Sequence, residues 1–355
     1  RAGQDPEIRI RGTNSINGFA PLYVVDGMFT DNINYLNAND IESFEILKDP
    51  SSLAIFGVRG ANGVIIITTK KAKEGQTRVN INGSFGFKRV TDKIAMVDAA
   101  GFKELYNEQL RNEGNPEFDF TPWTGNTDWQ DEIFQTGFIT NNNVSITGAS
   151  ARHSFYLGAG YAYEQGNIKH EKYSKVTLNI SNDYKVTDNF KVGFQFNGAR
   201  ILPADTKSVA TALRAAPVAP VYNAEYGLYT TLPGFQKAQM NNPMVDVDLK
   251  ANTTRAENYR ASGNVYGQWD FLKNFQFKVM YSMDYASNSS RTYTPVINVF
   301  DSSVEGNVVT LGNGKTGVKQ SKETEAKVQS DYLLTYTNTW GDHSLTATAG
   351  FTNYH

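Results

Sequence analysis

Apolar and polar residues alternate along most of the chain after position 76. The clearest segment spans residues 190–197, where Phe190, Val192, Phe194 and Phe196 alternate with Lys191, Gly193, Gln195 and Asn197. A period of two residues predicts β-strands with one apolar and one polar face. Similar segments begin near Val79, Val144, Phe155, Val176, Val265, Phe275, Tyr332 and Leu345. The pattern therefore predicts an all-β-dominated chain with about nine strands.

The connections between these strands alternate in length. Short turns are expected at 148–152, 185–188, 272–274 and 341–343, and long loops at 90–137, 164–172, 201–255 and 288–322. Short turns at one end and long loops at the other are typical of a transmembrane antiparallel β-barrel, as is a girdle of aromatic residues near the short turns. Candidates for that girdle are Tyr184, Phe190, Phe271, Phe275 and Trp340.

A soluble β-sandwich is the alternative, because its strands alternate in the same way. Strands of about ten residues or more can span a bilayer when tilted, which favours the barrel. In that case Phe190, Val192, Phe194 and Phe196 face lipid, while Lys191, Gln195 and Asn197 face the lumen. Bacterial single-chain barrels have even strand numbers, so an odd number leads us to expect a partial barrel, truncated at both ends.

The first 75 residues follow a different pattern, which predicts a small α+β domain. Strands are expected at 7–12, 22–25, 41–48 and 64–69, and one or two helical turns at 51–56. The run at 22–25 is short and wholly apolar, as in a strand covered on both sides, and the pair Asp26-Gly27 predicts a tight turn after it. We therefore expect one domain at 1–75 and a second at 76–355, in which the one convincing helix is 98–111, capped by Asp98.

Composition excludes several classes of protein. The chain has 355 residues, a formal net charge of −2 and no cysteine. A near-zero charge gives no reason to expect nucleic-acid binding, and the lack of cysteine excludes disulfides and thiolate metal sites. No apolar run reaches about 18 residues, which excludes transmembrane helices but leaves strands with alternate apolar residues possible.

Candidate catalytic patterns are weak. The turn GVRGANG at 57–63 lacks the Gly-Lys-Ser/Thr of a phosphate-binding loop and precedes a strand rather than a helix. The histidines have no metal-ligand spacing, and Asp246 and Asp248 lack the other ligands of a calcium loop. Asp128, Asp131 and Glu132 fit a solvated helix start better than a catalytic carboxylate pair. We expect no enzyme activity, no metal and no cofactor.

Several blocks of sequence resemble one family. They are RIRGTNSI, PLYVVDG, DIESFEILKDPSSLAIFGVRGANGVIIITTK, TDWQDEIF and NNNVSITGAS. Together they resemble the SusC/RagA-like branch of TonB-dependent outer-membrane transporters, strongly over residues 8–70 and thinly after Arg200. Asp49 and the ITTK ending favour this branch over the siderophore receptors. Pro50 and Phe56 depart from the commoner alanine and tyrosine, but both are compatible in shape.

The resemblance implies a plug domain (1–75) seated in a barrel of roughly 22 strands. This chain would supply the first part of that barrel (76–355), with long extracellular loops. It also implies the outer membrane of a Gram-negative bacterium, contact with its lipid, energy from the TonB–ExbB–ExbD complex and a SusD-like surface lipoprotein. The expected activity is import of a glycan oligomer or a peptide. The alternatives are a siderophore or cobalamin receptor, or a surface glycan-binding β protein that does not transport.

Within the plug, the resemblance singles out a set of signature and structural positions. They are Arg9, Arg11, Gly12, Asp26, Gly27, Glu42, Glu45, Lys48, Asp49, Gly57, Arg59, Gly60, Asn62 and Gly63. The charged members Arg9, Arg11, Glu42, Glu45, Lys48 and Arg59 are candidates for ion pairs with the barrel wall. The turn at 13–20 contributes Asn14, Asn17 and Phe19 as candidate ligand contacts.

Overall fold

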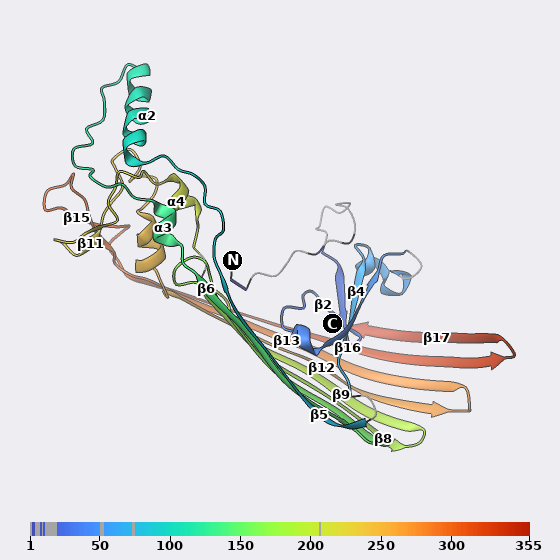
Figure 1. Cartoon of the computed structure of the whole chain (residues 1–355). Coiled ribbons are helices and arrows are strands. Elements are labelled where there is room, and N and C mark those ends of the chain that lie inside the picture. The colour runs from blue at the N-terminus through green and yellow to red at the C-terminus, as the bar shows by residue number, and fades with distance from the viewer. Residues whose placement is uncertain are drawn as a thin grey trace.

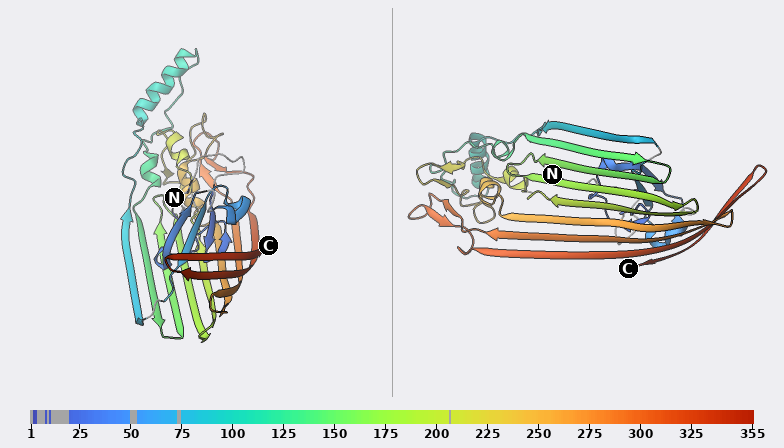
Figure 2. Two further views of the ribbon diagram at one scale, coloured as in Figure 1. Left: turned by 90° about the vertical axis from the view of Figure 1, so that its right-hand side faces the viewer. Right: turned by 90° about the horizontal axis from the view of Figure 1, so that it is seen from below.

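The structure is a computed structural model that describes residues 2, 3, 8, 10, 20–49, 53–72, 75–205 and 207–355. It is mostly β, with a four-stranded mixed sheet (the small sheet) lying against one face of a nine-stranded antiparallel sheet (the large sheet). The large sheet curves around the small one (Figure 1 and Figure 2).

The small sheet has the strand order β2-β1-β4-β3. Its strands are β1 (Leu22–Val25), β2 (Met28–Thr30), β3 (Ile41–Leu47) and β4 (Val64–Thr69), with 3₁₀ helices η1 (Ala38–Asp40) and η2 (Ala54–Gly60). β1 runs parallel to β4, while β2 and β3 pair antiparallel with their neighbours.

Both faces of β1 and β4 are covered. Tyr23 and Ile67 pack in one apolar cluster, whereas Val24 and Val64 pack in a second cluster on the opposite face. The predicted strands at 22–25, 41–48 and 64–69 are confirmed. Most of the strand predicted at 7–12 lies outside the described residues, and the helical turns predicted at 51–56 occur at η2.

The large sheet contains nine strands, each antiparallel to the next along the chain. They are β5 (Gly75–Lys88), β6 (Gly137–Ala149), β7 (His153–Gln165), β8 (Lys172–Thr187), β9 (Phe190–Leu202), β12 (Thr254–Phe271), β13 (Phe275–Thr294), β16 (Gly317–Trp340) and β17 (His343–Tyr354). The predicted alternation of short turns and long loops is confirmed.

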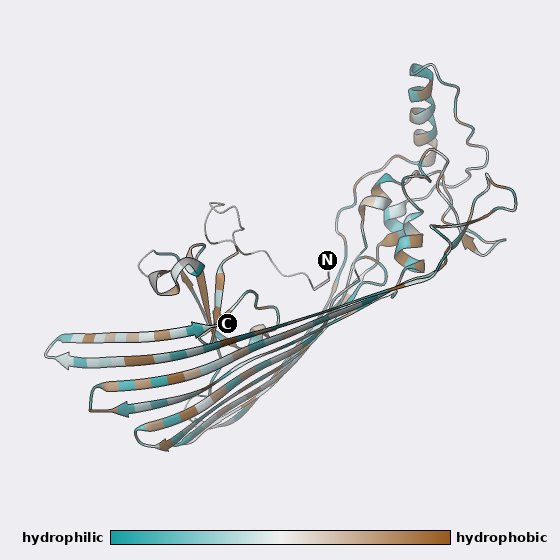
Figure 3. Cartoon of the chain, turned by 180° about the vertical axis from the view of Figure 1, so that it is seen from behind, coloured by the Kyte–Doolittle hydropathy of each residue, from teal (hydrophilic) through white to brown (hydrophobic). Residues whose placement is uncertain are grey.

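The large sheet buries polar side chains on one face and exposes apolar side chains on the other, which is the reverse of a sheet in a soluble protein. Polar side chains are buried on the face toward the small sheet, among them Asn143, Asn179, Gln195, Asn264, Asp284 and Gln329. Apolar side chains are exposed on the outer face, among them Ile81, Val144, Leu178, Phe194, Val265 and Tyr281. Figure 3 shows this alternation of hydropathy along the strands. An extended apolar outer face requires an apolar environment, as in a membrane barrel.

The register predicted for β9 is confirmed. Gln195 and Asn197 are each 5% exposed, whereas Phe190 is 38% and Phe194 is 40% exposed. Three aromatic residues of the predicted girdle are also exposed. They are Tyr184, Phe190 and Trp340.

The long connections form a unit of their own at one end of the large sheet, which we call the loop unit (residues 89–136, 203–205, 207–253 and 295–316). It contains the helices α2 (Ala99–Asn112), α3 (Trp129–Ile133), α4 (Ala210–Arg214) and the π-helix η3 (Val245–Leu249). Two small hairpins complete it: β10 (Tyr222–Asn223) with β11 (Leu228–Tyr229), and β14 (Asn298–Phe300) with β15 (Val308–Thr310).

The loop unit has its own apolar core, which includes Trp129, Val218 and Leu232. The predicted helix at 98–111 is confirmed as α2, with the Asp98 side chain accepting a hydrogen bond from Gly101 N at 2.9 Å. Asp128 caps α3 in the same way, which agrees with a helix start at that position. Among the described residues, the helices are too short or too polar to cross a membrane.

Candidate functional site at the junction of the two sheets

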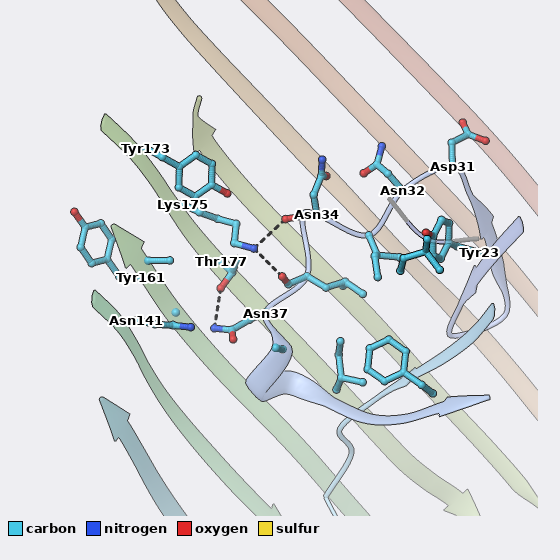
Figure 4. A pocket seen from close by; sticks show the side chains of 18 of the residues that line it. Tyr23, Asp31, Asn32, Asn34, Asn37, Asn141, Tyr161, Tyr173, Lys175 and Thr177 are labelled. Atoms are coloured by element: carbon cyan, nitrogen blue, oxygen red, sulfur yellow. Dashed lines mark hydrogen bonds between the residues drawn. The ribbon is translucent and has the colours of Figure 1, made fainter. Parts of the chain in front are cut away.

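A cavity of about 500 Å³ lies between the small sheet and strands β6 to β8 (Figure 4). On one side it is lined by the segment 31–38, which follows β2 and ends in η1. On the other side it is lined by Asn141, Tyr173, Lys175 and Thr177 of the large sheet. Ile33, Leu36, Ile41 and Phe44 contribute apolar surface. Such a mixture of apolar walls and a few polar groups is common in ligand sites.

The charged side chains that line the cavity are already paired. Lys175 Nζ donates to the carbonyl oxygens of Asn34 and Leu36, each at 3.0 Å (Figure 4). Asp31 forms an ion pair with Lys327 of β16. The carboxamides of Asn34 and Asn141, in contrast, make no side-chain hydrogen bond to the part of the chain that the structure describes. The polar groups open to a ligand are therefore uncharged donors and acceptors.

A buried ion pair on the large sheet holds the same segment. Arg260 of β12 donates through Nε to Asp284 Oδ1 of β13 at 2.8 Å and through a second nitrogen to Oδ2. Two further donors of Arg260 reach Thr30 Oγ1 at the end of β2 (2.5 Å) and Asn32 Oδ1 in the segment that follows (2.8 Å). The Arg260 side chain is 11% exposed and that of Asp284 is 3% exposed. We call these four residues, together with Tyr35, the clamp.

Tyr35 completes the clamp. The guanidinium of Arg260 lies 4.5 Å from the centroid of the Tyr35 ring, which is a favourable cation–π position. Burial raises the pKa of Tyr35 to about 12, so the phenol is neutral at physiological pH. Charge-assisted hydrogen bonds and ring stacking thus fix the end of β2 and the segment after it.

Asp40 of η1 makes a second junction with the large sheet. Its side chain is buried, and its Oδ1 accepts hydrogen bonds from Tyr156 Oη at 2.5 Å and Asn143 Nδ2 at 3.4 Å. Burial raises the pKa of Asp40. Gly158 on β7 leaves the necessary room, because a Cβ there would lie 2.7 Å from Asp40 Oδ1.

The turn Asp26-Gly27 makes a third junction. Both residues have positive φ, 49° and 93°, as a two-residue type I′ hairpin requires. Gln329 of β16 donates to the carbonyl oxygen of Gly27 at 2.9 Å and accepts from Phe29 N at 3.1 Å. The Asp26 carboxylate accepts from both Thr69 N and Thr69 Oγ1, and burial raises its pKa.

The other signature positions have varied surroundings. Arg59 contacts the large sheet, but through the ring of Tyr354 at 4.0 Å rather than through an ion pair. Glu42, Glu45, Lys48 and Asp49 are exposed, on β3 or next to its end. Gly57 and Gly63 have positive φ, Gly60 lies close to Phe56, and Asn62 Nδ2 donates to Ala20 O at 3.5 Å. The remaining predicted residues, Arg9, Arg11, Gly12, Asn14, Asn17 and Phe19, lie outside the described residues.

Residues of the large sheet that hold the small one were not among the predicted site residues. Arg260, Asp284 and Lys327 are charged residues on the inward face of alternating strands. Their inward position in the alternating pattern could have identified them as candidate site residues, because a charged side chain inside a barrel has to face water or a partner. The spacing of residues along the sequence could not indicate that their partners in the plug segment would be Thr30, Asp31 and Asn32.

Comparisons with known proteins agree with this architecture. Residues 1–64 match the family model of the TonB-dependent receptor plug domain. TonB-dependent receptor P26 of Formosa agariphila is 31% identical over 353 residues, which cover 97% of this chain and 35% of that protein. TonB-dependent receptor SusC of Bacteroides thetaiotaomicron is 29% identical over 323 residues, covering 82% and 32%. The chain thus spans about a third of the length of the curated relatives it matches.

The fold is also similar to that of a solved structure, the RagAB peptide importer in its closed-closed state. The TM-score is 0.76 at 20% sequence identity, over 94% of this chain and 41% of that one. The small sheet thereby corresponds to the plug and the large sheet to part of the barrel. The chain belongs to the SusC/RagA-like TonB-dependent receptors, whose members form β-barrels in the outer membrane of Gram-negative bacteria.

Proposed function

We propose that the whole protein imports a nutrient, a glycan oligomer or a peptide, across the outer membrane. In this proposal residues 1–75 form the plug, and residues 76–355 form the N-terminal portion of the barrel with its extracellular loops. The TonB–ExbB–ExbD complex supplies the energy and a SusD-like lipoprotein covers the barrel from outside. The proposal is supported by the similarity to TonB-dependent receptor SusC and to the RagAB peptide importer.

One observation carries the proposal furthest: the cavity and the clamp share a segment of the plug. Asn32 and Asn34 both line the cavity, and Asn32 is also held by Arg260. A ligand that contacts Asn34 therefore touches the chain two residues from the point where the plug is fastened to the barrel. Such a ligand can shift the equilibrium between a fastened and a released plug, provided that it binds the two states differently.

The chemistry of the cavity favours an uncharged cargo. Its free polar groups include the carboxamides of Asn34 and Asn141, while Asp31 and Lys175 are already engaged. Hydroxyl groups of a sugar can bond such amides, and the apolar faces of sugar rings can lie on Leu36 and Phe44. We therefore place a neutral glycan oligomer first and a peptide second. A charged iron chelate would need an unpaired counter-charge, and the described lining of the cavity offers none.

Uptake by cells tests this function. Cells that carry the full-length transporter and its lipoprotein should take up a labelled neutral oligosaccharide or peptide, and should stop doing so when TonB is removed. Binding to the cell surface should survive the removal of TonB. Uptake that continues without TonB contradicts active import. Binding without any uptake favours the surface glycan-binding alternative, and rescue of growth by an iron chelate or by cobalamin favours the receptor alternative.

A further inference from the structure

A second cavity, of about 230 Å³, lies within the loop unit and away from the plug. It lies between the segment 230–245 and the hairpin formed by β14 and β15. Its walls are largely aliphatic, with Leu232 and Val245 fully buried and Val299 only 1% exposed.

Several polar residues of this cavity retain hydrogen-bonding capacity, among them Thr231, Lys237 and Asp301. Thr231 is only 8% exposed, and its buried hydroxyl has no partner among the described residues. Lys237 Nζ donates to Asp301 Oδ2 at 2.9 Å and to Ser303 Oγ at 2.8 Å, so one of its three N–H groups stays uncommitted. Asp301 accepts from Lys237 and twice from Ser303, which leaves one of about four acceptor positions.

Asn242, another polar residue of the lining, has both of its N–H groups engaged and keeps one acceptor position on Oδ1. Its Nδ2 donates to the carbonyl oxygens of Val221 and Thr230, and its Oδ1 accepts from Met244 N. Among the described lining residues, the open positions therefore include the Thr231 hydroxyl, one N–H of Lys237 and one acceptor position of Asp301, and the Asn241 carboxamide also makes no side-chain hydrogen bond.

We propose that this cavity binds a free aliphatic α-amino acid, a ligand that the proposed transport activity does not require. The ligand's ammonium would occupy the open acceptor position of Asp301, and its carboxylate would accept from Lys237 and Thr231. An aliphatic side chain would fill the space beside Val245 and Val299. A zwitterion keeps the charge of the site balanced, whereas a simple cation or anion would leave an excess charge in a site where Asp301 is 2% exposed.

Calorimetric titration of the purified full-length protein with leucine tests the proposal without any mutation. Leucine should bind, while leucinamide, which lacks the carboxylate, and N-acetylleucine, which lacks the ammonium, should each bind at least tenfold more weakly. Serine, which lacks the aliphatic side chain, should also bind more weakly. Equal affinity for leucine and both derivatives, or no binding of leucine at millimolar concentration, overturns the proposal.

Variants then locate the site. Thr231→Val keeps the shape of the side chain and removes the hydroxyl, so it should weaken leucine binding several-fold, whereas Thr316→Val on the exposed loop should not. Asn34→Ala, in the cavity beside the plug, should leave leucine binding unchanged. If Asn34→Ala abolishes it and Thr231→Val does not, leucine binds at the plug and the assignment to the loop unit is wrong.

Discussion

Arg260 and Asp284 form a buried ion pair on neighbouring strands of the large sheet, and the arginine also donates to the side chains of Thr30 on β2 and of Asn32 just after it. The ion pair therefore lies wholly within the barrel wall. Thr30 and Asn32 of the plug only contribute further hydrogen-bond acceptors to the arginine. A plug that moves away leaves the two charges paired with each other. This arrangement can hold the plug firmly and still allow its release without exposing an isolated buried charge.

Removing one member of this pair should be costly. Arg260→Met leaves the Asp284 carboxylate buried and unpaired, which we expect to lower the free energy of unfolding of the full-length protein by about 3–5 kcal/mol. The double variant Arg260→Met with Asp284→Leu should recover much of that loss. Denaturant titration of the refolded protein in detergent measures both, with the exposed Lys319→Met as control. A single variant as stable as the unaltered protein would refute the role of the clamp.

The turn that joins β1 and β2 should not tolerate a side chain at Gly27. The backbone there has φ 93°, and a Cβ would lie 2.8 Å from Met280 Cε. Gly27→Ala should therefore destabilise the protein by about 1–3 kcal/mol through backbone strain. Gly234→Ala is the matched control, because a Cβ at that position would have no heavy atom within 4 Å and the φ of Gly234 is not positive. Equal unfolding midpoints for the two variants would contradict this explanation.

Stability should depend on pH through Asp40. Burial raises the pKa of Asp40 in the folded protein, so the folded state holds its proton more tightly than the unfolded state does. The resulting stabilisation is complete below the pKa of an unfolded aspartate, about 3.9, and is lost as the pH rises through the folded pKa. Asp40→Asn should remove this component from a plot of unfolding free energy against pH, whereas the exposed Asp92→Asn should retain it. An unchanged slope in Asp40→Asn would show that Asp40 is not the source.

The outer face of the large sheet should not tolerate a charged side chain. Val265 points outward, is 56% exposed and pairs with Phe194 on β9. Val265→Arg should cost about 2–4 kcal/mol in a lipid bilayer if the position is near the midplane. Val265→Ile should cost little at the same position. Unfolding in liposomes measures both, and a tolerated arginine would mean that this face does not contact lipid.

The spacing of apolar residues along the sequence predicted the regular elements of the fold. The strands, their inward and outward faces and the α2 helix all follow from local patterns of apolar and polar residues. The loop unit has no such pattern, so contacts such as that of Trp129 Nε1 with the carbonyl oxygen of Ala216 were not predictable.

The candidate site was harder to predict than the fold. Arg260 and Thr30 are 230 positions apart, and no local spacing indicates that they meet. Asn34, which lines the cavity, lies in an ordinary polar segment between β2 and η1. The turn Asp26-Gly27, in contrast, was predictable because two consecutive residues with positive φ favour this dipeptide.

If the cavity beside the plug recognises the imported cargo, the carboxamides of Asn34 and Asn141 must contribute to the affinity for that cargo. The decisive experiment is the concentration dependence of uptake in cells carrying Asn34→Ala with Asn141→Ala, compared with the loop variant Asn313→Ala. We predict that the double variant raises the apparent KM for a neutral oligosaccharide at least tenfold with little change in the maximal rate, while Asn313→Ala changes neither. An unchanged KM in the double variant would contradict recognition of the cargo at this cavity.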